Sequence, residues 1–236
     1  MIRAVLFDID DTLFPEQEYY SSGFRMVAQE LLSRGVGPAQ STQSLLERLA
    51  RTEDKGHTLD LASKQLGFPE EWVPDLVHLV RNHKPQISFF PDVVPALRIL
   101  RKRYRLGCVT DGHPLRQQRK IEALGLSAMV DAIVITDELG GIEYRKPHPL
   151  GFIRCCEKLQ VSLSECVVVG DSLQRDVKGA RNLGMLTVLL RRNDSTTDTD
   201  DPELPEKPTF EINSLSDVDG ILSSINQNAH CVSFDK

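Results

Sequence analysis

Acidic residues gather at two places in the sequence, at spacings that would let them share one site. Residues 8–12 read Asp-Ile-Asp-Asp-Thr, and Asp171 is followed five residues later by Asp176. Carboxylates brought together repel one another, by a few kcal/mol for a pair about 4 Å apart at intermediate dielectric. Such a cluster needs protons or a cation, and oxygen ligands of this kind suit Mg²⁺ completed by water and a phosphate. The acids therefore predict a magnesium-dependent site.

Groups of opposite character lie elsewhere in the chain. Lys146 stands in the segment 145–149 (Arg-Lys-Pro-His-Pro), whose two prolines favour a rigid, non-helical entry to a helix. Thr110 offers a hydroxyl, and the Asp111-Gly112 pair can form a tight turn with inward backbone N–H groups. A cation, a hydroxyl, backbone donors and a metal ion together neutralise a phosphoryl dianion. Phosphoryl transfer asks mainly for this environment around an in-line nucleophile.

Short apolar runs come directly before most of these polar residues, as expected for buried parallel strands. The runs are 4–7, 106–109, 132–135, 166–169 and 186–190. Helical patterns separate them, over 93–103, 115–124, 149–159 and 176–183. This alternation predicts an α/β fold, a Rossmann-like doubly wound parallel sheet built from βαβ units. Ligands bind at the carboxyl ends of such strands, where the polar residues lie.

One long segment interrupts the alternation. Residues 15–88 contain no convincing strand and instead show helical stretches, at 17–34, 41–52, 58–66 and 70–82. We interpret this segment as a helical module inserted after the first strand, leaving a core domain of residues 1–14 and 89–236. The alternative is a long helical crossover packed on the sheet, although a crossover needs only a dozen or so residues.

The C-terminal part of the chain continues the pattern after a polar interruption. Residues 193–208 are rich in Asp and Thr and contain three prolines, so we expect a surface loop. A last strand is expected at 210–212 and a final helix at 214–225, with a loose tail beyond.

Length and charge limit the size of the fold and argue against one class of function. The chain has 236 residues, enough for one large α/β domain or a core with a smaller module. Its formal net charge of -6 argues against broad nucleic-acid binding. The basic run 101–105 is interpreted as a solvated helix end, with a phosphate-attracting patch as the alternative.

The N-terminus and the cysteines indicate a cytoplasmic protein. The apolar run at 2–7 is too short for a signal peptide, and no apolar stretch approaches the ~20 residues that span a bilayer. The five cysteines are odd in number and show no metal-binding spacing, which fits a reducing compartment. We expect a monomer or homodimer without nucleic-acid or membrane partners.

The motifs, in this order, resemble those of the haloacid dehalogenase-like superfamily. Residues 8–12 match its DxDxT motif, Thr110 matches the second motif, Lys146 the third, and 170–176 (Gly-Asp-Ser-Leu-Gln-Arg-Asp) match GDxxxxD. Each motif alone is common, but four in order, all but the lysine at strand ends, are specific. The resemblance spans nearly the whole chain.

The resemblance implies the catalytic and metal-binding roles. Asp8 corresponds to the nucleophile that takes the phosphoryl group. Asp10 corresponds to the general acid that protonates the leaving oxygen and then, as a base, activates water. Mg²⁺ would be held by Asp8, the backbone carbonyl of Asp10 and Asp171, with Asp176 in or near the second coordination shell.

The resemblance also implies a phosphate site and a cap. Thr110, Asp111, Gly112 and Lys146 would bind the phosphoryl group. The insertion at 15–88 resembles a C1-type cap, which closes over the site and selects the leaving group. Candidate substrate contacts in the cap are Tyr19, Tyr20, Arg25, Lys55 and His57, although each also fits a packing or surface role.

The segment from Thr110 through Gln117, Lys120 and residues 124–126 is similar to the branch that holds N-acylneuraminate-9-phosphatase and some nucleotidases. This similarity implies a phosphatase for a small phosphorylated metabolite, a sugar phosphate or nucleoside monophosphate.

Four other functions fit parts of this pattern. A dehalogenase needs no metal and no second acid, which argues against it because Asp10, Asp171 and Asp176 are all present. A phosphomutase keeps all four motifs and differs only in its product. A receiver-type signalling module is about half this length and spaces its acids differently. A catalytically silent binding relative is disfavoured because every motif residue is present.

Overall fold

The computed structural model describes residues 1–51, 55–192 and 207–231, with side chains for 1–51, 56–192 and 207–227. The loop expected at 193–208 therefore falls almost entirely outside the described residues. In the described part of the chain, six parallel strands form one sheet in the order β3-β2-β1-β4-β5-β6. The predicted doubly wound α/β fold is confirmed.

The strands match the apolar runs of the sequence closely. They are β1 (Ala4–Phe7), β2 (Arg105–Thr110), β3 (Ala132–Ile135), β4 (Cys166–Gly170), β5 (Leu186–Leu190) and β6 (Phe210–Ile212). β1 pairs with β2 on one side and β4 on the other, so Phe7 lies beside both Cys108 and Val169. The strand order reverses between β1 and β4, and this switch point is where such sheets bind ligands.

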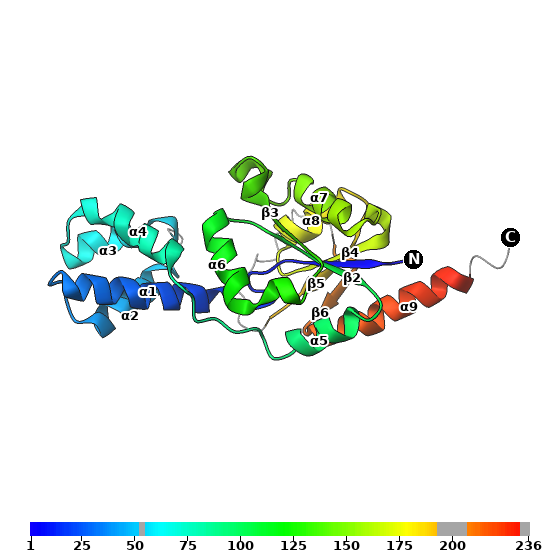
Figure 1. Cartoon of the computed structure of the whole chain (residues 1–236), viewed down its shortest axis with the longest axis horizontal. Helices are drawn as coiled ribbons and strands as arrows, with labels where there is room; N and C mark the ends of the chain where they lie inside the picture. The colour runs from blue at the N-terminus through cyan, green and yellow to red at the C-terminus, as the bar shows by residue number, and fades with distance from the viewer. Residues whose placement is uncertain (52–54, 193–206, 232–236) are drawn as a thin grey trace.

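The central strands β1 and β4 are buried and apolar along their whole length because both faces of the sheet are covered. Side chains alternate between the faces, so Val5 and Phe7 join one buried cluster while Ala4 and Leu6 join another. Helices α5 (Val93–Leu100) and α9 (Val218–Cys231) contribute to the first cluster, and α7 (Leu150–Leu159) and α8 (Lys178–Arg181) to the second. Figure 1 shows these two pairs on opposite sides of the sheet.

The segment between β1 and β2 is helical, as expected. It contains α1 (Glu16–Ser33), α2 (Ala39–Leu49), α3 (Thr58–Leu66) and α4 (Val73–Asn82), with 3-10 turns η1 (Lys55–His57) and η2 (Glu70–Trp72). Buried side chains between Phe24 and Leu76 form a cluster of their own. In Figure 1 these helices lie beyond the end of the sheet toward which β1 runs.

Helix α6 (Pro114–Leu124) follows β2 and carries side chains into the site described below. It starts with Pro114, whose fixed φ suits the first helical position, and ends at Gly125, whose φ of 61° closes the helix in the left-handed region. Gln117, Lys120 and Ile121 lie on its buried face, at the three- and four-residue spacing of one helix face.

The remaining elements are short or differ slightly from the expected boundaries. The short turns are η3 (Leu126–Ala128), η4 (Thr136–Leu139), η5 (Ile142–Tyr144), η6 (Leu163–Glu165), η7 (Leu173–Val177) and η8 (Leu215–Asp217). The helix expected at 176–183 instead begins as one π turn, η7, and continues as α8. Helix α9 extends to Cys231, past the expected end at 225. Within the described residues, no helix combines the length and apolar character needed to cross a membrane.

Candidate active site

The switch point brings together the acids that the sequence places far apart. Asp8 follows β1 and Asp171 follows β4, and these two strands are neighbours. The backbone N–H of Asp8 donates to the carbonyl of Val169 at 3.0 Å, which extends the pairing beyond the strands. Asp176 comes from η7, directly after β4. One carboxylate oxygen from each of Asp8, Asp171 and Asp176 lies within 4.8 Å of the others.

This acidic cluster is buried and incompletely satisfied. Among the described side chains, Asp8 Oδ2 and both carboxylate oxygens of Asp171 have no hydrogen-bond donor. Buried polar atoms are normally paired, so such orphans indicate a missing ligand. The three carboxylates outnumber the two neighbouring cations, Lys146 and Arg175, so the cluster keeps a formal negative charge. A divalent cation such as Mg²⁺ fits this set of hard oxygen ligands and would neutralise it.

The pKa values of Asp8 and Asp171 show the effect of burying several carboxylates close together. Burial, with the charges of Asp8 and Asp176, raises the pKa of Asp171 to about 9. Burial also raises the pKa of Asp8, to about 7, although Lys146 opposes this shift. Without a cation, the site therefore favours protons on carboxylates that a metal ion would keep ionised.

Lys146 is buried between two of these acids. Its Nζ lies 2.6 Å from Asp8 Oδ1 and 2.6 Å from Asp176 Oδ1. These charges raise the pKa of Lys146 despite its burial, so the ammonium stays protonated. Its backbone N–H donates to Asp111 Oδ1 at 3.0 Å, and Thr136 Oγ1 donates to the same oxygen at 2.7 Å. The Asp111 carboxylate therefore anchors the lysine-bearing segment to the end of β2.

The packing of Asp176 explains why a glycine ends β4. A Cβ built on Gly170 would lie 2.3 Å from the Asp176 carboxylate carbon, too close for any other residue. Asp176 Oδ2 accepts a hydrogen bond from the backbone N–H of Ser172 at 3.2 Å. This close approach of side chain to backbone fixes Asp176 against Lys146.

Asp10 has different partners from Asp8. Its Oδ1 lies 2.6 Å from Lys120 Nζ, and its Oδ2 accepts from Gln117 Nε2 at 3.0 Å. Burial would raise the pKa of Asp10, but Lys120, Arg116 and the Gln117 hydrogen bond outweigh it and lower that pKa. Its side chain thus faces α6 and is not one of the three clustered carboxylates, which leaves only its backbone carbonyl as a candidate metal ligand.

The other phosphate-binding candidates border the same site. Thr110 is fully buried, and its Oγ1 accepts from Gln117 Nε2 at 2.5 Å. The N–H of Gly112 donates to Asp137 Oδ1 at 3.2 Å, so in this structure that donor is already engaged. Asp137 accepts in turn from two nitrogens of the Arg145 guanidinium, Nε and Nη2, at 2.7 Å each.

The arrangement is a buried carboxylate beside an ammonium and two further buried carboxylates, at the switch point of a parallel sheet. A family model described as haloacid dehalogenase-like hydrolase matches residues 2–184. The chain belongs to the haloacid dehalogenase-like hydrolases. The family resemblance of its four motifs is thereby confirmed.

Named relatives in this family are phosphatases. Over 90% of this chain and 93% of the relative, it is 34% identical to glyceraldehyde 3-phosphate phosphatase of Methanopyrus kandleri. It is also 34% identical to human N-acylneuraminate-9-phosphatase, covering 95% of each chain. A solved phosphatase structure of the family from Thermococcus onnurineus superposes with a TM-score of 0.63 at 27% identity, covering 94% of this chain and 98% of that one. This haloacid dehalogenase-like protein is thus a phosphoric monoester hydrolase.

Among the cap candidates with described side chains, two lie against residues of α6 beside the motifs: the ring centre of Tyr19 lies 4.7 Å from Lys120 Nζ, and the second is Tyr20. Its hydroxyl pairs with Arg116 Nη1 at 3.2 Å. Tyr19 is fully buried and its hydroxyl donates to the carbonyl of Val80 at 2.9 Å. Arg25 instead pairs with Gln86 on the exposed surface, at 2.7 Å.

The two remaining candidates offer little support for a site. His57 is exposed and lies 3.5 Å from Asp60. The side chain of Lys55 falls outside the described residues.

Two arginines next to the motifs received no role from the sequence. Arg175 directly precedes Asp176, and its Nη2 lies 4.0 Å from Asp171 Oδ1. The guanidinium of Arg116 packs over Gly112, where an added Cβ would lie 2.5 Å from Nη2. The position of Arg175 inside the fourth motif could have indicated its placement, whereas Arg116 depends on the direction in which α6 leaves β2.

Proposed function

We propose that this chain is a magnesium-dependent phosphomonoester hydrolase that forms an aspartyl-phosphate intermediate on Asp8. The observation that carries the proposal is the state of the Asp8 carboxylate. One oxygen is held by Lys146, and the other is buried without a hydrogen-bond donor from the described residues, beside the carboxylates of Asp171 and Asp176. A nucleophilic oxygen needs such freedom to reach phosphorus, and its neighbours supply the charge that a phosphoryl group requires.

Asp8, Asp171 and Asp176, with the backbone carbonyl of Asp10, would hold the metal ion. When bound, Mg²⁺ would offset negative charge on the phosphoryl oxygens and on the acids themselves. Asp8 Oδ2 then attacks phosphorus while the bond to the leaving oxygen breaks. Asp10, which must carry a proton when the ester binds, gives it to that oxygen and later takes one from the water that hydrolyses the aspartyl phosphate.

The phosphoryl oxygens would be bound by Lys146 and by the Thr110 hydroxyl, together with the turn at Asp111 and Gly112. The Lys146 ammonium already lies against Asp8, at 2.6 Å. It therefore orients the nucleophile and stabilises charge in the transition state through the same group. The Gly112 N–H can join this set only if its hydrogen bond to Asp137 is exchanged.

We assign residues 15–88 to a cap and residues 1–14 with 89–236 to the core that carries the motifs. The separate cluster of buried side chains in α1–α4 supports this division. Such a cap would exclude water and select the leaving group. Tyr20, through its contact with Arg116, is the cap residue best supported as a substrate contact.

The proposed substrates are small phosphorylated metabolites, sugar phosphates or nucleoside monophosphates. Support comes from the relatives named for glyceraldehyde 3-phosphate and N-acylneuraminate 9-phosphate. We also propose a cytoplasmic enzyme, because the four cysteines with described side chains are all buried and free.

Phosphate release from a panel of these metabolites, with and without Mg²⁺, tests the proposal. We expect hydrolysis that depends on the metal ion and is lost in Asp8→Asn, by roughly 10³-fold or more as for removal of other nucleophiles. Asp8→Asn should keep the circular dichroism spectrum of the parent. Undiminished turnover in Asp8→Asn, or an isomerised sugar phosphate instead of free phosphate, would contradict the proposed reaction.

A further inference from the structure

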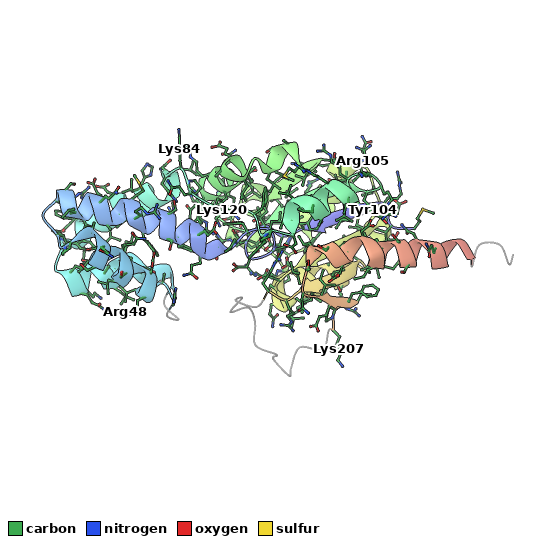
Figure 2. The ribbon with its side chains drawn as sticks, turned by 90° about the horizontal axis from the view of Figure 1, so that it is seen from below. Arg48, Lys84, Tyr104, Arg105, Lys120 and Lys207 are labelled. Carbon is green, nitrogen blue, oxygen red and sulfur yellow. The ribbon has the colours of Figure 1, made fainter. Side chains whose placement is uncertain are left out.

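Lys120 is a fully buried cation that the reaction proposed above does not use. None of its surface is exposed, although lysine is rarely buried without a partner. Its Nζ lies 2.6 Å from Asp10 Oδ1 and 3.4 Å from Glu16 Oε1. The ring centre of Tyr19 lies 4.7 Å away. Figure 2 shows Lys120 where helix α1 meets the sheet.

Gln117 lies one helical turn before Lys120 and binds the other carboxylate oxygen of Asp10. Its Nε2 donates to Asp10 Oδ2 at 3.0 Å and to Thr110 Oγ1 at 2.5 Å. Both oxygens of Asp10 are therefore held from the same helix, one by an ammonium and one by an amide. A carboxylate has about four acceptor positions, so two bonds leave room for a further partner.

We propose that Lys120 and Gln117 are positioning residues that hold the Asp10 carboxylate in the orientation from which it exchanges a proton with the leaving oxygen. The inference rests on the proposed function, because it presumes that Asp10 is the general acid and base. Two short bonds on opposite oxygens restrict rotation about both side-chain torsions of Asp10. General acid catalysis depends on that geometry before anything else.

Contacts on the other side of Lys120 extend this role to the base of the cap. Glu16 and Tyr19 belong to the first turns of α1, and both face the ammonium that holds Asp10. Placement of α1 and orientation of Asp10 therefore share one cation. Removing its charge leaves Asp10 without its closest partner.

The dependence of kcat/KM on the leaving group distinguishes a variant in which the general acid is misplaced from one in which the whole active site is disrupted. The p-nitrophenolate of an aryl phosphate such as p-nitrophenyl phosphate leaves without protonation, whereas the alcohol of an alkyl phosphate needs a proton on its leaving oxygen. kcat/KM covers the steps up to departure of the alcohol. We would measure kcat/KM with both substrates for the parent, Lys120→Met, Gln117→Met and Asp10→Asn.

The expected result is a selective loss. Lys120→Met should lower kcat/KM for the alkyl phosphate by roughly 10–10²-fold, part of the 10²–10⁴-fold that a general acid supplies, and lower the aryl value much less. Gln117→Met should show a smaller loss of the same selective kind. Lys120→Arg keeps the positive charge and should therefore lose less kcat/KM for the alkyl phosphate than Lys120→Met. The control Arg119→Met removes a neighbouring cation of α6, which pairs with exposed Glu122, and should match the parent.

Each contrary result would contradict a different part of the proposal. Equal losses for the two substrates in Lys120→Met and Gln117→Met, while Asp10→Asn remains selective, would overturn the positioning role alone. An Asp10→Asn variant without selectivity would instead contradict the proposed role of Asp10. In the Asp10→Asn background, Lys120→Met should add no further selectivity, and an added loss would also overturn the inference. If Lys120→Met unfolds, Gln117→Met and Lys120→Arg carry the same comparison.

Discussion

Charged side chains gather at both ends of the parallel strands, which we call the carboxyl edge, where the strands finish, and the amino edge, where they begin. The two edges differ in how far these side chains are buried and paired. At the carboxyl edge, Asp8, Asp171 and Asp176 are buried and three of their oxygens lack donors among the described residues. The amino edge carries exposed arginines around a hollow of about 400 Å³, lined by Arg3, Arg101, Arg103, Tyr104, Arg105 and Asp131. Figure 2 shows Tyr104 and Arg105 toward the other end of the molecule from α1.

Most of the amino-edge arginines have acidic partners of their own. Arg3 lies 3.2 Å from Glu165, Arg101 lies 3.6 Å from Asp131, and Arg103 pairs with Asp219. Exposed pairs of this kind are hydrated and contribute little free energy. A dense run of charge in the sequence is thus a weak indicator of function. Burial without complete pairing is the stronger indicator, because it leaves a free-energy cost that a bound ligand or a proton must offset.

The largest effect on stability should come from the binding of Mg²⁺ to the acidic cluster at the carboxyl edge. Mg²⁺ at about a hundredfold excess over its dissociation constant should stabilise the folded protein by about 2.7 kcal/mol. The corresponding rise in melting temperature is several degrees for a chain of this size. Asp171→Asn should lose most of this rise, which differential scanning calorimetry with and without a chelator would measure. An equal rise in Asp171→Asn would contradict a metal site at Asp171.

The metal-free protein should also respond to pH at this edge. Because the pKa of Asp171 is raised from 3.8 to about 9, the folded state binds more protons than the unfolded state between these values. Stability of the metal-free protein should therefore fall as pH rises through this range, and Asp171→Asn should flatten the fall. Parallel stability curves for the two proteins would contradict this assignment.

An intermediate effect is expected where a charge at the same edge is fully partnered. Asp92 accepts from Arg192 at 2.9 and 3.0 Å, from Ser214 at 2.9 Å and from the N–H of Leu215 at 2.8 Å. Asp92→Asn should destabilise the protein by about 1–3 kcal/mol, as expected for losing hydrogen bonds between charged groups, with no effect on metal binding. Urea denaturation measures the first and a Mg²⁺ titration the second.

The pH dependence of this effect has the opposite sign from that of the acidic cluster. Burial raises the pKa of Asp92, but the Leu215 N–H and the Arg192 and Ser214 side chains outweigh it, so the pKa is lowered. The stability that Asp92 contributes is present above its ordinary pKa and is lost as pH falls through the lowered value. The difference between parent and Asp92→Asn should shrink in acid, and a constant difference would contradict this account.

The smallest effect is expected at the amino edge. Arg3→Ala removes an exposed ion pair and should change the free energy of unfolding by no more than about 0.5 kcal/mol, as for most surface substitutions. Turnover and metal binding should equal those of the parent. A clear loss of turnover would show that this edge also binds a ligand, which would remove the contrast between the two edges.

The sequence was sufficient for the sheet and for the residues that meet at its carboxyl edge. Apolar runs ending in polar residues predicted strands such as β1 and β4, and the strand-end rule predicted that Asp8 and Asp171 converge. Helices in the segment between β1 and β2 were also predicted, because their apolar residues recur at helical spacing. Such local patterns need no knowledge of distant side chains.

The hydrogen-bond partners of Asp10 and Gly112 could not be predicted from such local patterns. Lys120 and Gln117 have a clear spacing on α6, but nothing in the sequence says which face of α6 turns toward Asp10. The capture of the Gly112 N–H by Asp137 likewise depends on how β3 ends beside β2. These contacts join elements whose relative rotation is set by packing of the whole core.

Identification of the phosphorylated residue during turnover tests the account most directly. The protein would be mixed with Mg²⁺ and a hydrolysed metabolite, quenched in acid, digested and analysed by mass spectrometry. We expect a transient gain of one phosphoryl group on the peptide that carries Asp8, and none in Asp8→Asn. Phosphorylation of another residue, or full turnover by a variant that cannot be phosphorylated at position 8, would contradict the account.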